Sequence, residues 1–444
     1  MKTDRNNGYF MRSFVMATFA CASLLTVFSG CDEDWEYRPP LSRNDAIIPA
    51  SLDLDGNAFF GVIGVGGSPI SGDGRYVTFA TRADDETEQS LAQVYRVDLQ
   101  DGSSTLISRN ADGAPGDRDS GVPSIDSDGD TVTFASFAQN FAPGLDLPAV
   151  GVYDPAVYTW EASTGAVKGA GAFTSTNPSI SADGNTVCFR NNDLPVCLDT
   201  RNNQTTIPML LDDDTWDSGE PAYDFLNPVV NRDGTVIALV TDRPFDEDDD
   251  NGLADVYVFE ASGLNTPQRV SILPDGKSVD CESHQPVLSA DGSMVAFTSC
   301  SALGFTDGIT EDQIIYLFNR RASTLTALMP TNPPSTPAED MVEWGNGWRP
   351  SISADGRYVS FEQYMDGEWG ILVWDLERDM YAPVVNGHIF DASDPDLYRG
   401  AAGGMISADG TTILFAAYTS FWQQWSRYTL FVTANPLFQV PPVE

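Results

Sequence analysis

The chain has 444 residues, enough for two or three ordinary domains or for one array of repeats, because single hydrophobic cores stop growing at about 250–300 residues. It carries 64 acidic and 24 basic residues, and a formal net charge of −40 repels nucleic acid phosphates and anionic lipid headgroups. We therefore expect no nucleic acid partner and no electrostatic docking to membranes. The charge alone does not separate simple solubility from attraction of a cationic partner or calcium.

Residues 1–30 are predicted to be an export signal. Three basic residues precede an apolar run from Phe14 to Phe28, which is too short for a stable membrane anchor. The small residues before Cys31 resemble the lipobox of bacterial lipoproteins, although Phe28 stands where that pattern prefers an aliphatic residue. The resemblance implies lipidation of Cys31, and the alternative is an ordinary signal peptide with a chance cysteine. Residues 31–48 would then form a lipidated N-terminus and a polar tether.

Seven Asp-Gly pairs recur along the rest of the chain, 50 to 64 residues apart. A β-branched residue lies four positions after each Asp, and Phe or Leu lies six positions after it, an alternation that predicts a half-buried strand. A proline lies five positions before the Asp in five copies. The first copy has Pro69 instead and the last has Gly404. The pairs are Asp73-Gly74, Asp128-Gly129, Asp183-Gly184, Asp233-Gly234, Asp291-Gly292, Asp355-Gly356 and Asp409-Gly410.

Each repeat is predicted to contain four strands. The first strand turns at an S-x-D-G segment and returns as the second, because Gly adopts the positive φ of a tight turn and the Ser and Asp side chains cap free backbone N–H groups. Turn chemistry explains all seven Asp residues, so we assign them no catalytic role. Third strands are predicted at residues 93–99, 156–162, 195–200, 255–261, 314–320, 371–376 and 428–432, and fourth strands are visible at 104–109 and 323–329.

Four strands per unit of roughly fifty residues predict an all-β fold, a seven-bladed β-propeller of four-stranded antiparallel blades over residues 49–438, followed by a tail at 439–444. The signature P-S-I-S-A-D-G-x-x-V-x-F resembles the TolB-type, WD-like propeller repeats of bacterial envelope proteins. That resemblance is specific for the fold, whereas such repeats serve as binding platforms, peptidase gates and lyase scaffolds. The seventh blade lacks a fourth strand at the C-terminal end, and our hypothesis is that the segment at residues 50–56 supplies it.

Long loops are predicted on the face opposite the S-x-D-G turns, at residues 135–154, 212–226, 241–255, 301–313, 330–349 and 416–427. One of them is acidic. Glu247, Asp249, Asn251 and Asp255 fall near positions one, three, five and nine of a calcium loop, with Val258 where the bidentate Glu would stand. Calcium is the possible cofactor, and a solvated acidic loop is the alternative.

Aromatic residues gather in the loops of the sixth and seventh repeats. Tryptophan and tyrosine are favoured at recognition surfaces, because a rigid ring brings a large contact area and a polar group. Packing between blades is the alternative for some of them. The candidate patch consists of Trp344, Trp348, Tyr364, Trp369, Trp422 and Trp425.

Four cysteines lie within the repeats. Cys281 and Cys300 are placed almost symmetrically about one S-x-D-G turn, and Cys188 and Cys197 flank the short turn between the second and third strands of the third repeat. Both pairs suit disulfides in an oxidising compartment, and free buried thiols are the alternative.

A catalytic constellation is not visible. The chain has two histidines, His284 and His388, and no G-x-S-x-G motif. We expect a monomeric, lipid-anchored cell-envelope protein, facing the periplasm or the cell surface, that binds an envelope protein or peptide segment, or a glycan, without catalysis. The alternative is a polysaccharide lyase or hydrolase at the channel mouth, using residues such as Glu343, Arg349 and Glu362. A purely structural surface lipoprotein is a third interpretation.

Overall fold

The computed structural model describes residues 47–51, 62–64, 67–82, 90–141, 155–171, 176–191, 194–206, 225–261, 266–272, 281–300, 313–331, 344–385, 400–419 and 427–438. Regular secondary structure in these ranges is all β. No helix within them is long and apolar enough to cross a membrane. The predicted export signal, Cys31 and the tail at 439–444 lie outside the described residues.

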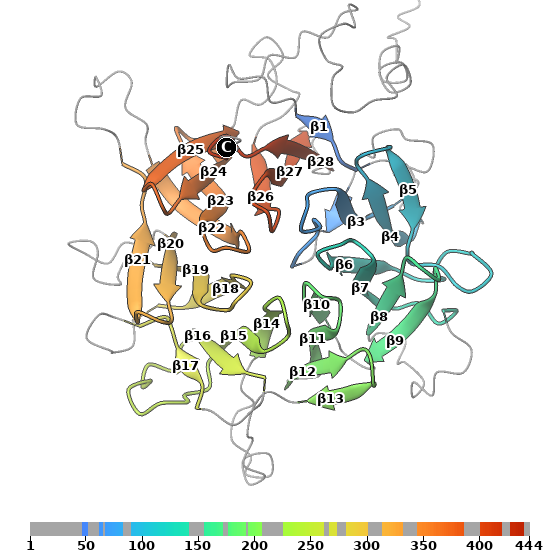
Figure 1. Cartoon of the computed structure of the whole chain (residues 1–444), viewed down its shortest axis with the longest axis horizontal. Helices are drawn as coiled ribbons and strands as arrows, with labels where there is room; N and C mark the ends of the chain where they lie inside the picture. Colours follow the sequence, from blue (N-terminus) through green and yellow to red (C-terminus); the bar gives the residue numbers. More distant parts are fainter. Residues whose placement is uncertain are drawn as a thin grey trace, which may run out of the picture.

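Seven four-stranded antiparallel blades surround a central axis, which confirms the predicted propeller (Figure 1). The first three blades contain, from the axis outward, β2 (Val62–Gly64), β3 (Tyr76–Arg82), β4 (Ala92–Asp98) and β5 (Ser103–Leu106); β6 (Ser120–Ile125), β7 (Thr131–Ser136), β8 (Ala156–Glu161) and β9 (Val167–Gly171); β10 (Thr176–Ile180), β11 (Thr186–Asn191), β12 (Leu194–Asp199) and β13 (Gln204–Thr206).

The other four blades follow the same order. They contain β14 (Phe225–Val230), β15 (Val236–Thr241), β16 (Asp255–Glu260) and β17 (Gln268–Arg269); β18 (Ser283–Leu288), β19 (Met294–Cys300), β20 (Gln313–Asn319) and β21 (Thr324–Leu328); β22 (Trp344–Ile352), β23 (Tyr358–Met365), β24 (Glu368–Asp375) and β25 (Met380–Val385); β26 (Ala401–Ile406), β27 (Thr412–Thr419), β28 (Arg427–Ala434) and β1 (Ile48–Pro49).

The N-terminal segment completes the seventh blade. Strand β1 pairs with β28 through Ile48 opposite Val432, and the N–H of Ala50 donates to Leu430 O at 2.7 Å (Figure 1). The hypothesis that the two ends of the chain meet in this blade is confirmed, with the strand two residues earlier than expected. Residues 52–56 lie outside the described part of the chain. Pairing with β1 covers an edge that β28 would otherwise expose.

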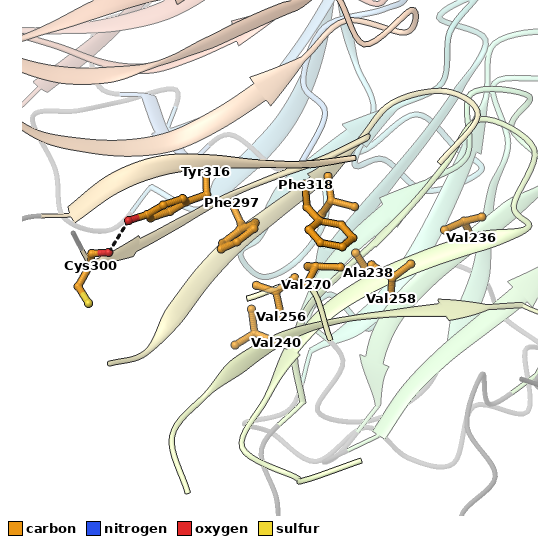
Figure 2. Close-up of a cluster of buried hydrophobic side chains, with 11 residues drawn as sticks. Val236, Ala238, Val240, Val256, Val258, Val270, Phe297, Cys300, Tyr316 and Phe318 are labelled. Carbon is orange, nitrogen blue, oxygen red and sulfur yellow. Dashed lines mark hydrogen bonds between the residues drawn. The ribbon is translucent and has the colours of Figure 1, made fainter. Parts of the chain in front are cut away.

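The hydrophobic core lies between neighbouring blades. The aromatic or leucine residue of each second strand is buried, and it packs with side chains of the preceding blade. In Figure 2, Phe297 and Tyr316 of the fifth blade face Val240 and Val256 of the fourth. Full burial of one such side chain is worth about 1.5–3 kcal/mol, so the seven repeats stabilise each other rather than folding separately. The seven residues are Phe79, Phe134, Phe189, Leu239, Phe297, Phe361 and Phe415.

The S-x-D-G turns form a closed ring of backbone hydrogen bonds. A backbone N–H of each turn donates to a carbonyl oxygen of the next, from Gly72 N–H to Ser127 O at 2.8 Å through to Asp409 N–H, which returns to Gly72 O at 2.9 Å. The turn glycines have φ between 65° and 79°. A Cβ on Gly129 would lie 2.1 Å from the ring of Tyr76 in the preceding blade. Glycine is therefore required both for the turn and for the close approach of the blades.

The inner strands contain bulges that the sequence did not predict. In five blades the residue before the recurring proline, or before Gly404, has positive φ between 51° and 67°, and the pairing with the second strand shifts register there. A residue in this conformation is typical of one kind of β-bulge. Residues before proline usually prefer extended backbone, so the sequence pattern predicted regular strands without bulges at these positions. The five residues are Val122, Asn177, Gln285, Arg349 and Gly403.

Candidate binding site on the loop face

The tip of the β23–β24 hairpin presents two aromatic side chains together. Asp366 and Gly367 form its two-residue turn with φ of 51° and 88°, which matches the right-handed twist of the strands. Tyr364 and Trp369 are directly opposite each other, and their ring centroids are 5.4 Å apart at an interplanar angle of 66°. Tyr364 is 36% exposed. The pair offers a rigid aromatic edge with a phenol hydroxyl group.

The other described aromatic residues do not join this pair as one patch. Trp344 lies opposite Met365, so it points to the other side of the sheet from Tyr364. It packs into the core between the fifth and sixth blades and meets Tyr381 edge-on at 5.9 Å. The prediction of one six-residue patch is therefore wrong for Trp344. This residue packs between blades, which was the alternative considered for some of these aromatic residues. Trp422 and Trp425 lie outside the described residues.

Trp348 belongs to the inner strand of the same blade. It is half-buried and lies opposite Glu362, on the side of the sheet that also carries Tyr364. The bulge at Arg349 follows it directly. Trp348, Tyr364 and Trp369 are therefore the part of the predicted patch that shares one side of the sixth blade.

A polar network lies beside them on the inner strands. The buried carboxylate of Glu362 accepts hydrogen bonds from Arg349 Nη1 at 2.9 Å and from the N–H of Gly403. The N–H of Arg349 donates to Gln285 Oε1 at 3.0 Å. The side chain of Arg349 is 56% exposed, so a guanidinium fixed by a buried partner faces solvent at this point. Blades five, six and seven all contribute to this network.

The residues of the enzyme alternative are only partly brought together. Arg349 and Glu362 form an ion pair, whereas the Nε2 atom of His284 lies 3.3 Å from Glu282. Glu343 and His388 lie outside the described residues. Within the part of the chain that the structure describes, a His beside the Arg349–Glu362 pair is not observed.

The acidic loop of the fourth blade is organised around an arginine. Arg269 of β17 is buried, with 3% of its side chain exposed, and its Nη2 atom lies 2.9 Å from Asp246 Oδ1. Its Nη1 atom lies 3.6 Å from Asp249 Oδ1 and 3.5 Å from Asp255 Oδ2. Tyr257 donates its hydroxyl to Asp249 at 2.5 Å, and Ser271 donates to Asp255. A guanidinium thus lies among the carboxylates.

Burial changes the ionisation of this cluster. Desolvation raises the pKa of Asp255 to about 6, with a smaller contribution from the charge of Asp249. Burial also raises the pKa of Asp249, although the hydrogen bond from Tyr257 and the charge of Arg269 oppose it. The pKa of Tyr257 is raised by burial and by its bond to Asp249.

The predicted calcium ligands do not converge. Asp249 and Asp255 meet at Arg269, while Glu247 is exposed and Asn251 Oδ1 accepts the N–H of Leu253 at 2.9 Å. Across the described ranges, no three His, Cys, Asp or Glu side chains gather in a way that could hold a metal ion. The acidic spacing was visible in the sequence, but Arg269, which lies among these carboxylates, comes from the next strand and was missed.

Both predicted disulfides are present. Cys188 and Cys197 lie opposite each other in β11 and β12, and their sulfur atoms are bonded. Cys281 and Cys300 join the open end of the β18–β19 hairpin. The free-thiol alternative is thereby excluded for these four residues. Each bond holds a hairpin of one blade together rather than linking two blades.

Comparisons with known proteins support the fold alone. No family model and no curated protein sequence matches the chain. Among solved structures, oligogalacturonate lyase from Vibrio parahaemolyticus is similar with a TM-score of 0.51 and 10% identity, over 89% of this chain and 97% of the lyase. TolB from Acinetobacter baumannii is similar with a TM-score of 0.41 and 16% identity, over 72% of this chain and 66% of TolB. The propeller domain of the trilobed protease from Pyrococcus furiosus is similar with a TM-score of 0.49 and 11% identity, over 80% of this chain and 94% of that domain. TolB proteins are among the structural neighbours of this chain, whose seven blades show the propeller fold directly.

Proposed function

We propose that the protein is a lipid-anchored module of the cell envelope that binds a protein segment through the loop face of blades five to seven, without catalysis. The observation that carries the proposal is the pair of exposed Tyr364 and half-buried Trp369 at the tip of a tight hairpin, on the same side of the blade as Trp348. A rigid aromatic pair loses little conformational entropy on binding, and tyrosine and tryptophan are common among residues that dominate binding energy.

The exposed guanidinium of Arg349 adds an orienting charge to this surface. Its bond to the buried Glu362 and the positive φ of its backbone fix its position before a ligand arrives. A fixed arginine recognises a carboxylate or backbone carbonyl with little ordering cost. An aromatic pair with a fixed guanidinium therefore suits a peptide that carries both apolar and acidic groups.

Paired substitutions test the proposal. The double variant Tyr364→Ala, Trp369→Ala should lose retention of its envelope partner on immobilised protein at least tenfold, because alanine removes both rings. Met380→Ala is the matched control, since Met380 is an exposed apolar residue on the outer strand of the same blade. Equal retention by the wild type and the double variant would remove the aromatic pair from the binding site.

A polysaccharide lyase or hydrolase is the second candidate. The Arg349–Glu362 pair supports it, because a cation and a carboxylate near the axis are groups that such reactions use. Incubation with acidic polysaccharides and analysis of chain length tests it. The enzyme interpretation requires turnover that Glu362→Gln abolishes while the melting temperature is retained.

A further inference from the structure

One of the seven Asp-Gly turns departs from the hydrogen-bonding pattern of the others. In five blades the serine hydroxyl donates to the turn aspartate at 2.6–2.9 Å, as Ser181 does to Asp183. The fourth blade has Asn231, whose amide nitrogen donates to Ala290 O at 3.2 Å and whose side chain also hydrogen-bonds to Asp233. The second blade has Asp126 at this position, two residues before Asp128. An ionised carboxylate has no hydrogen to donate, so this turn alone places two acceptors together.

Asp126 is closely enclosed. It is 4% exposed, and its N–H donates to Thr131 O at 3.0 Å, as the serine N–H does in the other turns. Its Oδ1 atom has no hydrogen-bond partner. A Cβ added to Gly184, in the third turn, would lie 2.7 Å from Asp126 Oδ2, so the next blade closes over the carboxyl group. In the described part of the chain, no Arg or Lys forms an ion pair with Asp126.

The charged groups near this turn do not supply a counterion. Asp128 and Asp130 belong to the turn itself, and Asp183 lies beside Gly184 in the third turn. From the first blade, Tyr76 packs against Gly129, and Arg96 is held 3.7 Å above the ring of Tyr76. From the second blade, the N–H of Ala162, next to Glu161, donates to Asp130 O. The carboxyl group of Asp126 is therefore stabilised by a proton more readily than by a cation.

Ionisation of the turns differs accordingly. Burial, with a smaller contribution from the charge of Asp128, raises the pKa of Asp126 to about 7, and hydrogen bonds from Thr131 oppose the shift. At the equivalent turn of the third blade, burial is outweighed by hydrogen bonds from Ser181 and Asn185, and the pKa of Asp183 is lowered. Similar hydrogen bonds lower the pKa values of Asp233 and Asp291.

We propose that the second turn is a proton-dependent joint in the ring of blades: a proton on Asp126 is donated to Asp128 in place of the missing serine hydroxyl, and its loss to solvent loosens this turn. Ser127 lies between the two carboxyl groups, accepts from Gly72 N–H and donates to Ala182 O at 3.0 Å. Repulsion between Asp126 and Asp128 therefore acts on the bonds that join the second blade to the first and third. The other six joints lack this sensitivity.

The raised pKa of Asp126 makes this turn more stable at low pH than at high pH. Asp126 has a raised pKa in the folded chain, so the folded state holds a proton that the unfolded chain has already released at neutral pH. The contribution of this turn is complete below the unfolded pKa, decreases as pH rises toward about 7, and is lost above it. The protonated fraction of Asp126 should therefore fall as pH rises through about 7.

Hydrogen exchange of the full chain tests the joint. Loosening of the second turn should raise the exchange rates of the Gly72 and Ser127 amides at least fivefold between about pH 6 and pH 8, after correction for the intrinsic pH dependence of exchange. The Ala290 and Ala354 amides, which belong to other joints, should show no matching rise. Asp126→Ser, which restores the common turn, and Asp126→Asn, which copies the fourth blade, should both abolish the rise. Conversely, Ser181→Asp should install it in the third turn at Ser127 and Asp183.

Two results would overturn the proposal. One is a wild-type pH profile at Gly72 and Ser127 that matches the other joints. The other is a rise that persists unchanged in Asp126→Ser or Asp126→Asn. The two replacements use different donors, so failure of one variant to fold leaves the other as a complete test.

Discussion

Replacement of Arg269 by methionine should destabilise the propeller strongly. The side chain is 3% exposed, and Asp249 and Asp255 beside it are 2% and 1% exposed. Methionine fills most of the volume but leaves these carboxylates buried without a counterion. Breaking a buried ion pair from one side typically costs about 3–5 kcal/mol, and we expect a loss in this range at neutral pH.

The cost should depend on pH in a defined direction. Asp255 has a raised folded pKa of about 6, so its protonated form is already favoured in the fold, and without Arg269 the pKa should rise further. Protonation removes the unpaired charge. The difference between Arg269→Met and the wild type should therefore be largest above about pH 6 and should shrink as pH falls toward the unfolded pKa near 4.

Urea unfolding followed by tryptophan fluorescence at pH 7 and pH 5 measures this difference. Arg321→Met is the matched control, because Arg321 pairs with Asp291 at 2.7 Å while 75% of its side chain is exposed. Exposed pairs contribute about 0–1 kcal/mol. Equal losses for Arg269→Met and Arg321→Met, or a loss for Arg269→Met that is independent of pH, would refute the role assigned to the buried arginine.

Three further predictions concern the scaffold. The Cys281→Ser, Cys300→Ser variant removes a disulfide that closes a loop with a sequence separation of 19. Its free energy of unfolding, measured with urea, should fall by about 3 kcal/mol, the value that the chain-entropy relation gives for a loop of this length. Ala50→Asp places a charge in the buried core directly after β1, the strand that completes the seventh blade, and should lower the melting temperature by several degrees. Leu91→Asp, at an exposed position, should leave the melting temperature unchanged. Phe297→Ala should cost about 3–5 kcal/mol, and a loss below about 1 kcal/mol would contradict the importance of packing between blades.

Much of the scaffold could be predicted because its determinants are local. Each Asp-Gly turn needs glycine for positive φ, and the buried residues of the following strand lie at fixed sequence positions after it. Because this pattern recurs seven times, it predicts seven blades. The same symmetry about a turn predicted that Cys281 and Cys300 meet at the open end of their hairpin, where they are bonded. The ring of hydrogen bonds between turns was not predicted, since it joins residues about fifty positions apart and depends on the angle between blades.

The candidate site was predicted less completely. An unforeseen register shift between Trp344 and Gly347 of β22 pairs Trp344 with Met365. Alternation along β23 places Met365, and with it Trp344, on the other side of the sheet from Tyr364. The acidic spacing at Asp249 and Asp255 suggested calcium because the sequence does not reveal that Arg269 reaches the same point from β17. In each case a contact between separate strands decided the outcome.

Photo-crosslinking from the hairpin tip tests the proposed function most directly. A benzophenone amino acid replaces Tyr364 in the full chain, is irradiated in intact envelopes, and is compared with the same replacement at Met380. The proposal predicts one discrete adduct at position 364, absent at position 380 and reduced by Trp369→Ala, whose mass spectrum identifies a peptide. No adduct at position 364, or the same adducts at both positions, would contradict a binding role for this surface.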